Sequence, residues 1–235
     1  MRVALVTGAA TGIGRAIAER LETDGWTVAR NDLPGTNVRF PTDVSSPEQV
    51  RSMVSSIEEQ LGPVALLVNN AATISLGSIE EVPEPEFWRI INTNLYGSFL
   101  CAQRCAPRMR EKSWGRIISM ASEWGQIGWP RATAYSASKA GIISLTKALA
   151  RELGPYGITA NAIAPSVVDT DGLIADAQDA GVSLEEMKRQ YAGHIPLGRL
   201  GQPREIAALV SFLATDAAET LTGQVLAPNG GTTCC

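Results

Sequence analysis

Val3-Ala-Leu-Val6 is followed without a break by Thr7-Gly-Ala-Ala-Thr-Gly-Ile-Gly14 and then by the run Arg15-Ala-Ile-Ala-Glu-Arg-Leu21. The apolar run predicts a buried strand and the last run predicts an amphipathic helix, so the glycines lie where a strand gives way to a helix. Glycine there permits a tight turn and a close approach of the backbone to a pyrophosphate, which would lie on the free N–H groups of the helix N-terminus. The spacing Gly-x-x-x-Gly-x-Gly differs from the general dinucleotide fingerprint, so a plain strand-to-helix turn stays open at this point.

The same alternation of short apolar runs and longer helical segments continues along the chain. Further strands are predicted at Trp26–Ala29, Val64–Val68, Arg116–Ser119, Ile158–Ile163 and Gln224–Leu226. Helices are predicted at about 84–110 and 134–153, and two more begin at Ser46-Pro47 and at Pro203. This alternation is typical of a parallel sheet covered by helices on both faces. We therefore predict an α/β fold: a single Rossmann-type domain over residues 1–235, with a doubly wound parallel sheet of about seven strands.

The segment from Pro165 to Pro196 differs from the rest, because it shows no strong periodicity between two confidently predicted elements. A long insertion of this kind would suit a mobile lid over a binding site. We expect a substrate lid at about residues 171–195.

Size and composition describe an ordinary globular protein. With 235 residues and 45% hydrophobic content, the chain can bury one sizeable core. The net charge of −4, without runs of like charge, argues against nucleic acid or an anionic membrane as a partner. There is no apolar stretch near the roughly 20 residues that span a bilayer, no signal-peptide pattern, and no disulfide or zinc spacing among the four cysteines. We expect a cytoplasmic protein without a bound metal.

Asp32 is the acidic residue that bears on the choice of nucleotide. It stands 18 residues after Gly14, at the end of the second predicted strand, near the distance at which an acid meets the ribose 2′-hydroxyl of NAD. A carboxylate there would repel the 2′-phosphate of NADP. Two alternatives stay open: Asp32 could be a turn residue before Pro34-Gly35, and Arg30 could serve a 2′-phosphate.

Tyr135-Ser-Ala-Ser-Lys139 opens the second long helix and places a phenol and an ammonium one turn apart on one face. Tyrosine titrates near pH 10, so a tyrosine that acts as a base at neutral pH needs a strong positive charge nearby. Lys139 together with an oxidised nicotinamide would supply it. On its own, Tyr-x-x-x-Lys occurs by chance in many helices.

These motifs occur in a fixed order with several other segments: Thr7–Gly14, Asn69-Asn-Ala-Ala72, Asn94, Ser122, Tyr135–Lys139, Pro165–Thr170, Ile195–Arg204, Leu221–Val225 and Gly230-Gly231. Together they resemble the short-chain dehydrogenase/reductase family over essentially the whole chain. The resemblance implies hydride exchange between a nicotinamide cofactor and a secondary alcohol or its ketone, with no metal.

The resemblance also implies a role for each matching residue. Tyr135 would be the acid and base, Lys139 would lower its pKa and hold the nicotinamide ribose, Ser122 would hold the substrate oxygen, and Asn94 would keep a proton-relay water. Contacts with NAD are expected from Gly8, Thr11, Gly12, Ile13, Gly14, Asp32, Asp43, Val44, Asn70, Ala71, Tyr135, Lys139, Pro165, Val168 and Thr170. Without the family, Asp43, Asn70 and Thr170 could be ordinary turn or loop residues.

The chain departs from the family at two places. Only 11 positions separate Asp32 from Asp43, which leaves no room for the helix that family members place between their second and third strands. A compact turn at Leu33–Val38 is expected instead, with a more exposed adenine side. Ser166 stands where the family more often has glycine after proline.

The substrate side is expected at Ser122, Glu123, Trp129 and Tyr135. The tryptophans near Ser122 suggest apolar or stacking contacts, and Glu123 could bind a hydroxyl or an amine. The alternatives are that the tryptophans pack in the core or a subunit contact and that Glu123 is solvated. His194 is interpreted as a lid or surface residue, and Cys101 and Cys105 as small residues on an inward helix face.

The leading hypothesis is an NAD-dependent alcohol dehydrogenase that acts on a small alcohol or carbonyl substrate. One alternative is an NADPH-dependent reductase of carbonyls or 3-oxoacyl thioesters. A second alternative, from another class of protein, is a nucleotide-binding protein without turnover. The resemblance also implies a homotetramer.

Overall fold

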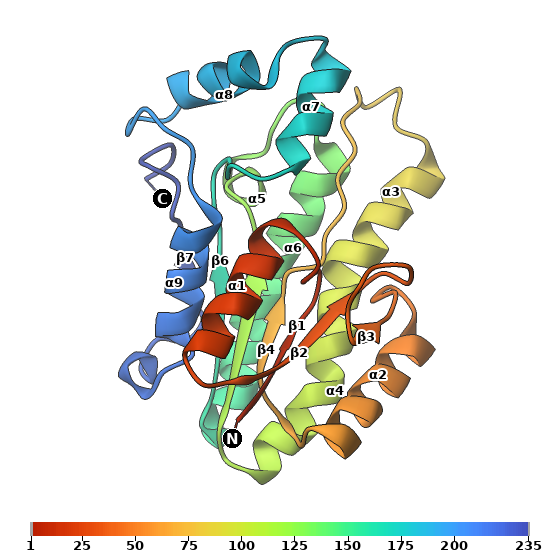
Figure 1. Cartoon of the computed structure of the whole chain (residues 1–235), viewed down its shortest axis with the longest axis vertical. Helices are drawn as coiled ribbons and strands as arrows, with labels where there is room; N and C mark the ends of the chain where they lie inside the picture. The colour runs from red at the N-terminus through yellow and green to blue at the C-terminus, as the bar shows by residue number, and fades with distance from the viewer. Residues whose placement is uncertain (1, 235) are drawn as a thin grey trace.

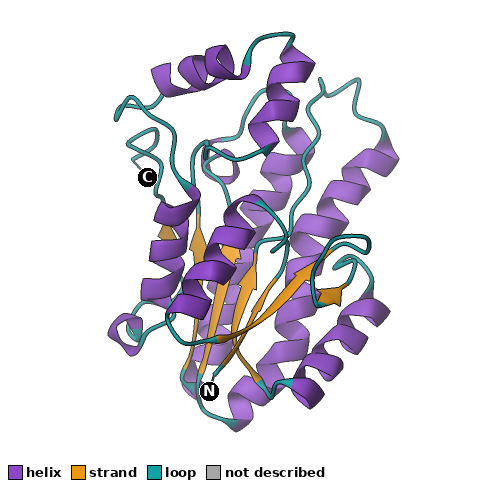
Figure 2. Ribbon diagram, viewed as in Figure 1, coloured by secondary structure: helices purple, strands orange, loops and turns teal. Residues whose placement is uncertain are grey.

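The computed structural model describes residues 2–234, which contain one sheet of seven parallel strands in the order β3-β2-β1-β4-β5-β6-β7 (Figures 1 and 2). The strands are β1 (Val3–Val6), β2 (Thr27–Asp32), β3 (Phe40–Pro41), β4 (Val64–Asn69), β5 (Gly115–Met120), β6 (Ile158–Ile163) and β7 (Val225–Leu226). The strand order reverses between β1 and β4, so a ligand crevice is expected outside the carboxyl ends of these two strands. The predicted fold class is confirmed.

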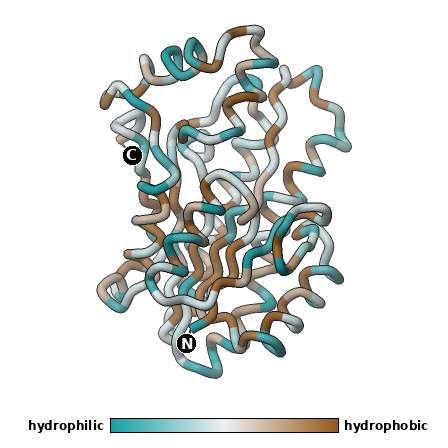
Figure 3. The backbone as a smooth tube through the Cα atoms, viewed as in Figure 1, coloured by the Kyte–Doolittle hydropathy of each residue, from teal (hydrophilic) through white to brown (hydrophobic). Residues whose placement is uncertain are grey.

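Helices cover both faces of the sheet, as the complete burial of β1 requires. Val3 and Leu5 pack in one core with α2 (Pro47–Gln60), α4 (Gly97–Glu111) and α6 (Thr133–Leu153). Ala4 and Val6 pack in the opposite core with α1 (Gly12–Thr23) and α9 (Pro203–Leu213). Successive strand residues point to opposite faces, so a strand buried on both faces is apolar throughout. Figure 3 shows this hydrophobic character along the central strands.

The two helix starts predicted from proline are confirmed. The Ser46 hydroxyl accepts a hydrogen bond from the Gln49 N–H at the start of α2. At the start of α9, the Glu205 carboxylate accepts one from the Gln202 N–H at 2.8 Å. Both contacts satisfy N–H groups that have no partner within the helix.

The predicted helix at 84–110 is interrupted. It consists of α3 (Glu84–Ile91), a π-helical turn η1 (Asn92–Tyr96) and α4. A π-turn inserts one extra residue without breaking the hydrophobic pattern, so the periodicity of the sequence does not reveal it. Asn94 lies within this turn.

The segment between Pro165 and Pro196, for which no element was predicted, contains α7 (Gly172–Ala180) and α8 (Leu184–Gly193). Both helices lie beyond the carboxyl ends of the strands, at the top of Figure 1. The Ser183 hydroxyl caps α8 by accepting from the Glu186 N–H at 3.1 Å, a start signal that the sequence did contain. The remaining short helices are α5 (Trp124–Ile127), η2 (Gly154–Tyr156) and η3 (Asp216–Ala218).

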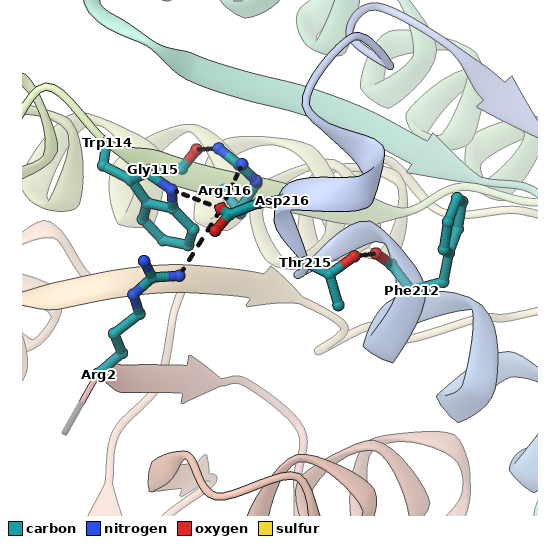
Figure 4. Close-up of polar contacts among 7 residues, drawn as sticks. All are labelled: Arg2, Trp114, Gly115, Arg116, Phe212, Thr215 and Asp216. Carbon is teal, nitrogen blue, oxygen red and sulfur yellow. Dashed lines mark hydrogen bonds and ion pairs between the residues drawn. The ribbon is translucent and has the colours of Figure 1, made fainter.

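A polar cluster closes the opposite, amino end of the sheet (Figure 4). Asp216 Oδ1 accepts hydrogen bonds from Trp114 Nε1 at 3.1 Å and Arg116 Nη2 at 3.4 Å, and Arg2 lies 3.9 Å away. The guanidinium groups of Arg2 and Arg116 lie 4.0 and 4.3 Å from the centroid of the Trp114 ring. The cluster joins the start of the chain to β5 and η3, far from the crevice.

Candidate active site

A cleft of about 910 Å³ lies at the carboxyl ends of β1, β2 and β4. Its walls include most of the predicted cofactor contacts: Gly8, Thr11, Gly12, Ile13, Gly14, Asp32, Asp43, Val44, Asn70, Ala71 and Thr170. Four other predicted contacts, Tyr135, Lys139, Pro165 and Val168, do not line this cleft. The structure thus brings 11 of the 15 expected cofactor contacts together in one cleft, and the other four lie outside its walls.

The glycine turn is packed so tightly that side chains would not fit. A Cβ on Gly14 would lie 1.9 Å from the carbonyl oxygen of Gly8, and one on Gly8 would lie 2.9 Å from Asn70 Nδ2. Asn70 Nδ2 donates to the carbonyl oxygens of Thr7 at 3.0 Å and Gly8 at 2.9 Å. The Thr11 side chain does not cap α1, and Gly12, Ile13 and Gly14 of its first turn line the cleft. This cradle fits a pyrophosphate.

Thr7, the first residue of the glycine segment, has a structural role that the motif alone did not indicate. Its hydroxyl accepts hydrogen bonds from the N–H groups of Asn70 and Ala71, both at 3.0 Å. It therefore fixes the end of β4 against the end of β1. Its position between strand and first glycine is the signal that could have indicated it.

Asp32 ends β2 with its carboxylate in the cleft. Oδ2 accepts from the Ala10 N–H at 2.9 Å, and Oδ1 accepts from the Leu33 N–H at 2.8 Å. Arg30 points elsewhere and forms a two-pronged ion pair with Glu22 of α1, at 2.9 and 2.7 Å, which raises the pKa of the guanidinium. Among the described residues that line the cleft, Arg89 is the one basic side chain, and it hydrogen-bonds Thr73 and both carboxylate oxygens of Glu86.

The predicted compact turn between β2 and β3 is confirmed. Residues 33–39 contain turns and no helix, and Leu33 is 56% exposed. Asp43 Oδ1 accepts from the N–H of Ser45 at 2.9 Å and from its hydroxyl at 2.7 Å, which orders the approach to α2. Thr170 closes the opposite wall, 3.6 Å from where a Cβ on Gly12 would lie.

Tyr135 and Lys139 lie one turn apart on α6, beside Ser122 at the end of β5. Lys139 Nζ donates to the carbonyl oxygen of Met120 at 2.7 Å and lies 5.4 Å from the centroid of the Tyr135 ring. Ser122 is buried, and its oxygen accepts from the Trp124 N–H at 3.2 Å. Gly125 lets α5 approach α6, because a Cβ there would lie 2.7 Å from the Lys139 backbone.

Burial dominates the electrostatics of this pair. It raises the pKa of Tyr135 to about 12, and a hydrogen bond with Ser122 lowers this pKa only in part. Burial also lowers the pKa of Lys139 to about 7. The protein by itself therefore favours a protonated phenol, and proton removal by Tyr135 requires additional positive charge nearby.

Asn94 is fully buried, and its side chain joins Thr73 to α6. Its Oδ1 accepts from the Thr73 N–H at 2.8 Å, and its Nδ2 donates to the carbonyl oxygen of Thr73 and to Ser138 Oγ, both at 3.0 Å. Ser138 in turn donates to the carbonyl oxygen of Tyr135 at 2.7 Å. The polar atoms of the Asn94 side chain are thus all hydrogen-bonded, and its carbonyl oxygen accepts from Ser98 Oγ at 2.7 Å. Ser138 was missed from the sequence, although it lies between Tyr135 and Lys139.

Two tryptophans, Trp124 and Trp129, lie close to Tyr135. Trp124 and Trp129 stack with ring centroids 5.2 Å apart, and Trp124 meets Tyr135 edge-on at 5.9 Å. Trp129 is 41% exposed, so it is not a core residue. Glu123 is 4% exposed, so the alternative of a solvated carboxylate is wrong.

His194 is exposed at the end of α8, and its Nδ1 lies 2.8 Å from the carbonyl oxygen of Gln190. Cys101 and Cys105 are fully buried on α4, where burial raises the pKa of both thiols, that of Cys101 to about 12. The interpretations of these three residues are confirmed. Cys235 lies outside the described residues. Within residues 2–234, no helix is both long and apolar enough to cross a membrane.

The chain is similar over nearly its whole length to several known proteins. Residues 8–233 match the family model described as enoyl-(acyl carrier protein) reductase. The chain is 39% identical to nodulation protein G of Azospirillum brasilense, covering 98% of this chain and 97% of that protein. It is 38% identical to 3-oxoacyl-(acyl-carrier-protein) reductase FabG of Staphylococcus aureus, with 97% and 96% covered. Among solved structures, ligand-free aldohexose dehydrogenase of Thermoplasma acidophilum superposes with a TM-score of 0.91 at 34% identity, over 98% of this chain and 93% of that one.

Proposed function

This chain belongs to the short-chain dehydrogenase/reductase family and is an NAD(P)-dependent oxidoreductase that acts on CH–OH groups, and from that premise we propose that it is an NAD-dependent alcohol dehydrogenase. Its reaction is the reversible oxidation of a secondary alcohol to a ketone.

The observation that carries the choice of NAD is the position of Asp32. Its carboxylate is fixed by two backbone N–H groups at the wall of the cleft, while Arg30 is engaged by Glu22. A 2′-phosphate would bring at least one further negative charge toward this carboxylate, whereas a ribose 2′-hydroxyl can donate a hydrogen bond to it. Repulsion of the first and attraction of the second both favour NAD.

The bound nicotinamide would supply a hydride acceptor, and its positive charge in the oxidised form would favour the phenolate of Tyr135. The protein's own residues would do the rest. The glycine cradle and Asp32 would hold the adenosine and pyrophosphate portion of NAD, Thr170 would close over it, and Ser122 would donate a hydrogen bond to the substrate oxygen. Tyr135 would accept the hydroxyl proton during oxidation and return it during reduction.

Lys139 would have two tasks in this scheme. Its ammonium would hold the nicotinamide ribose and favour the phenolate of Tyr135. The Met120 carbonyl oxygen, 2.7 Å from Nζ, fixes the amine for both tasks. Asn94 and Ser138 would keep α6 in place through the hydrogen bonds described above.

A second candidate, reduction of a 3-oxoacyl thioester with NADPH, is favoured by the similarity to the reductase of Staphylococcus aureus. The two candidates differ in cofactor and in the bulk of the substrate.

We propose that α7 and α8 form the substrate lid over residues 171–195. The ion pair between Lys188 Nζ and Asp169 Oδ1, at 2.9 Å, ties this lid to the loop after β6.

A panel of secondary alcohols, polyols, ketones and a 3-oxoacyl thioester, each assayed with NAD(H) and NADP(H) by nicotinamide absorbance, tests the proposal. Turnover of secondary alcohols with NAD supports it. Turnover confined to the thioester with NADPH supports the second candidate and contradicts the first.

We also propose a homotetramer that pairs in part through α4 and α6. The rings of Tyr96 and Phe99 are 38% and 40% exposed and stack 6.2 Å apart on this side of the molecule. Exposed aromatic side chains of this kind are typical of a subunit contact.

A further inference from the structure

Glu123, the residue after Ser122, has a carboxyl group whose two oxygens differ. Oε1 accepts a hydrogen bond from Ser166 Oγ at 2.8 Å. Oε2 is buried and has no hydrogen-bond partner. Such a half-satisfied acid in a protein interior needs an explanation, because a buried polar atom without a partner costs stability.

Three separate segments meet at this carboxyl group. Glu123 belongs to the loop after β5, which carries Ser122, and its N–H donates to the Pro165 carbonyl oxygen at 3.0 Å. Ser166 belongs to the loop after β6, which leads to Val168 and Thr170. Thr232 belongs to the C-terminal segment; its hydroxyl donates to the Asn229 carbonyl oxygen at 2.6 Å, and its oxygen lies 3.4 Å from Ser166 Oγ. Glu123 therefore connects the serine that is proposed to hold the substrate with the loop that is proposed to hold the nicotinamide.

This arrangement explains the departure at position 166. The glycine that family members more often have there offers no hydroxyl, so Glu123 would lose its donor at 2.8 Å. Ser166 thus links Glu123, at 2.8 Å, to Thr232, at 3.4 Å, and glycine at position 166 would break both contacts.

The surroundings of the carboxyl group favour its neutral form. Burial raises the pKa of Glu123, and the hydrogen bond from Ser166 and the nearby Thr232 hydroxyl lower this pKa only in part; no charged side chain contributes. Within residues 2–234, no lysine, arginine or histidine forms an ion pair with it. An ionised carboxylate would leave Oε2 as a buried negative atom without a donor.

We propose that Glu123 is a positioning residue, whose buried carboxyl group fixes the Ser122 loop against the loop after β6 and the C-terminal segment. Since Oε2 is not accessible, this role fits better than direct contact with the substrate. The proposal rests on the proposed function, because it takes Ser122 and the loop after β6 in the roles given above.

Activity measurements on Glu123→Ala, Glu123→Gln and Ser166→Gly test the role. Loss of the carboxyl group should lower kcat about 10- to 100-fold, since small displacements of an aligned group have effects of this size, and KM and the Kd for NADH should change less than about threefold. Gln keeps an acceptor for Ser166 Oγ and resembles the neutral acid, so Glu123→Gln should retain kcat within about threefold. Ser166→Gly should lie between them. Thr232→Val removes the hydroxyl and keeps the packing, whereas Thr232→Ser keeps the hydroxyl and loses a methyl group. Of these two variants, only Thr232→Val should lower kcat.

Two readouts do not depend on turnover. Hydrogen exchange measured by mass spectrometry should increase in residues 121–127 and 164–170 for Glu123→Ala and Ser166→Gly, but not for Glu123→Gln. Because the folded state raises the pKa of Glu123, its stability contribution is complete below the pKa of an unfolded carboxyl and is lost as pH rises through the folded value. Glu123→Gln should therefore melt about 2–6 °C above the wild type at pH 8, with a smaller gap at pH 5.

Several outcomes overturn the proposal: equal kcat for Glu123→Ala and wild type, a change in KM alone, which indicates substrate contact, or unchanged exchange in both segments. If the wild type turns over none of the panel, the proposed function fails, and the exchange and melting comparisons still decide whether Glu123 joins the loops.

Discussion

Replacing Asp32 by Asn should relax the choice between NAD and NADP. The substitution keeps the size of the side chain and an oxygen that can accept from the Ala10 N–H, now at 2.9 Å, but removes the negative charge from the cleft. Discrimination against NADP should fall, because repulsion of the 2′-phosphate is lost. NAD should also bind less tightly, since its 2′-hydroxyl loses a charged acceptor.

The size of the effect follows from Coulomb's law. Two unit charges about 4 Å apart interact by roughly 1 kcal/mol in water and roughly 4 kcal/mol at an effective dielectric constant of 20. Asp32 is half-buried at the wall of an open cleft, so a value of about 1.5–3 kcal/mol is reasonable. The ratio of kcat/KM for NADP to that for NAD should therefore rise about 10- to 100-fold.

Initial rates with both cofactors on one substrate provide the assay. The matched control is Glu22→Gln, which weakens the ion pair that holds Arg30 at 2.7 Å and leaves Asp32 untouched. The control should not change the ratio. An unchanged ratio in Asp32→Asn, or a rise in Glu22→Gln instead, would refute the assignment of cofactor choice to Asp32.

Three further outcomes are expected. Gly14→Ala should weaken NADH binding, measured by fluorescence titration, at least about 100-fold, because a Cβ would lie 1.9 Å from the Gly8 carbonyl oxygen; near-normal binding would show that the turn can rearrange. Because the pKa of Tyr135 is raised to about 12, kcat/KM for alcohol oxidation should rise up to about tenfold per pH unit below pH 7 while ketone reduction should not. Above pH 7 the rise should level off, because Lys139, with a pKa of about 7, loses the charge that favours the phenolate; parallel profiles for the two directions would speak against Tyr135 as the titrating group. Phe99→Arg should yield a smaller assembly than the wild type in light scattering, and an unchanged mass would exclude this side of α4 as a contact.

The sequence was sufficient for the parts of the fold that repeat a simple pattern. The run Val3–Val6 is apolar throughout because both of its faces are buried, and such runs located six of the seven strands. The strand β3 (Phe40–Pro41) has only two residues, too few for a periodic signal. The π-turn at Asn92–Tyr96 leaves the hydrophobic pattern intact, so periodicity could not locate it.

In the candidate site, too, the sequence predicted some residues and could not predict others. Motif spacing brought Asp32 and the glycine turn to one cleft. It could not reveal Ser138 or the carboxyl group of Glu123, because their roles depend on partners far away in the chain. Glu123 lies 43 positions from Ser166, and only the fold brings them within 2.8 Å.

The most direct test of the account is the effect of Tyr135→Phe on a substrate that the wild type turns over. The account predicts that kcat falls about 10²- to 10⁴-fold, because the phenol that exchanges the proton is gone, while the Kd for NADH changes less than about threefold. Undiminished turnover with an intact Kd would contradict the central claim that Tyr135 is the acid and base of this enzyme.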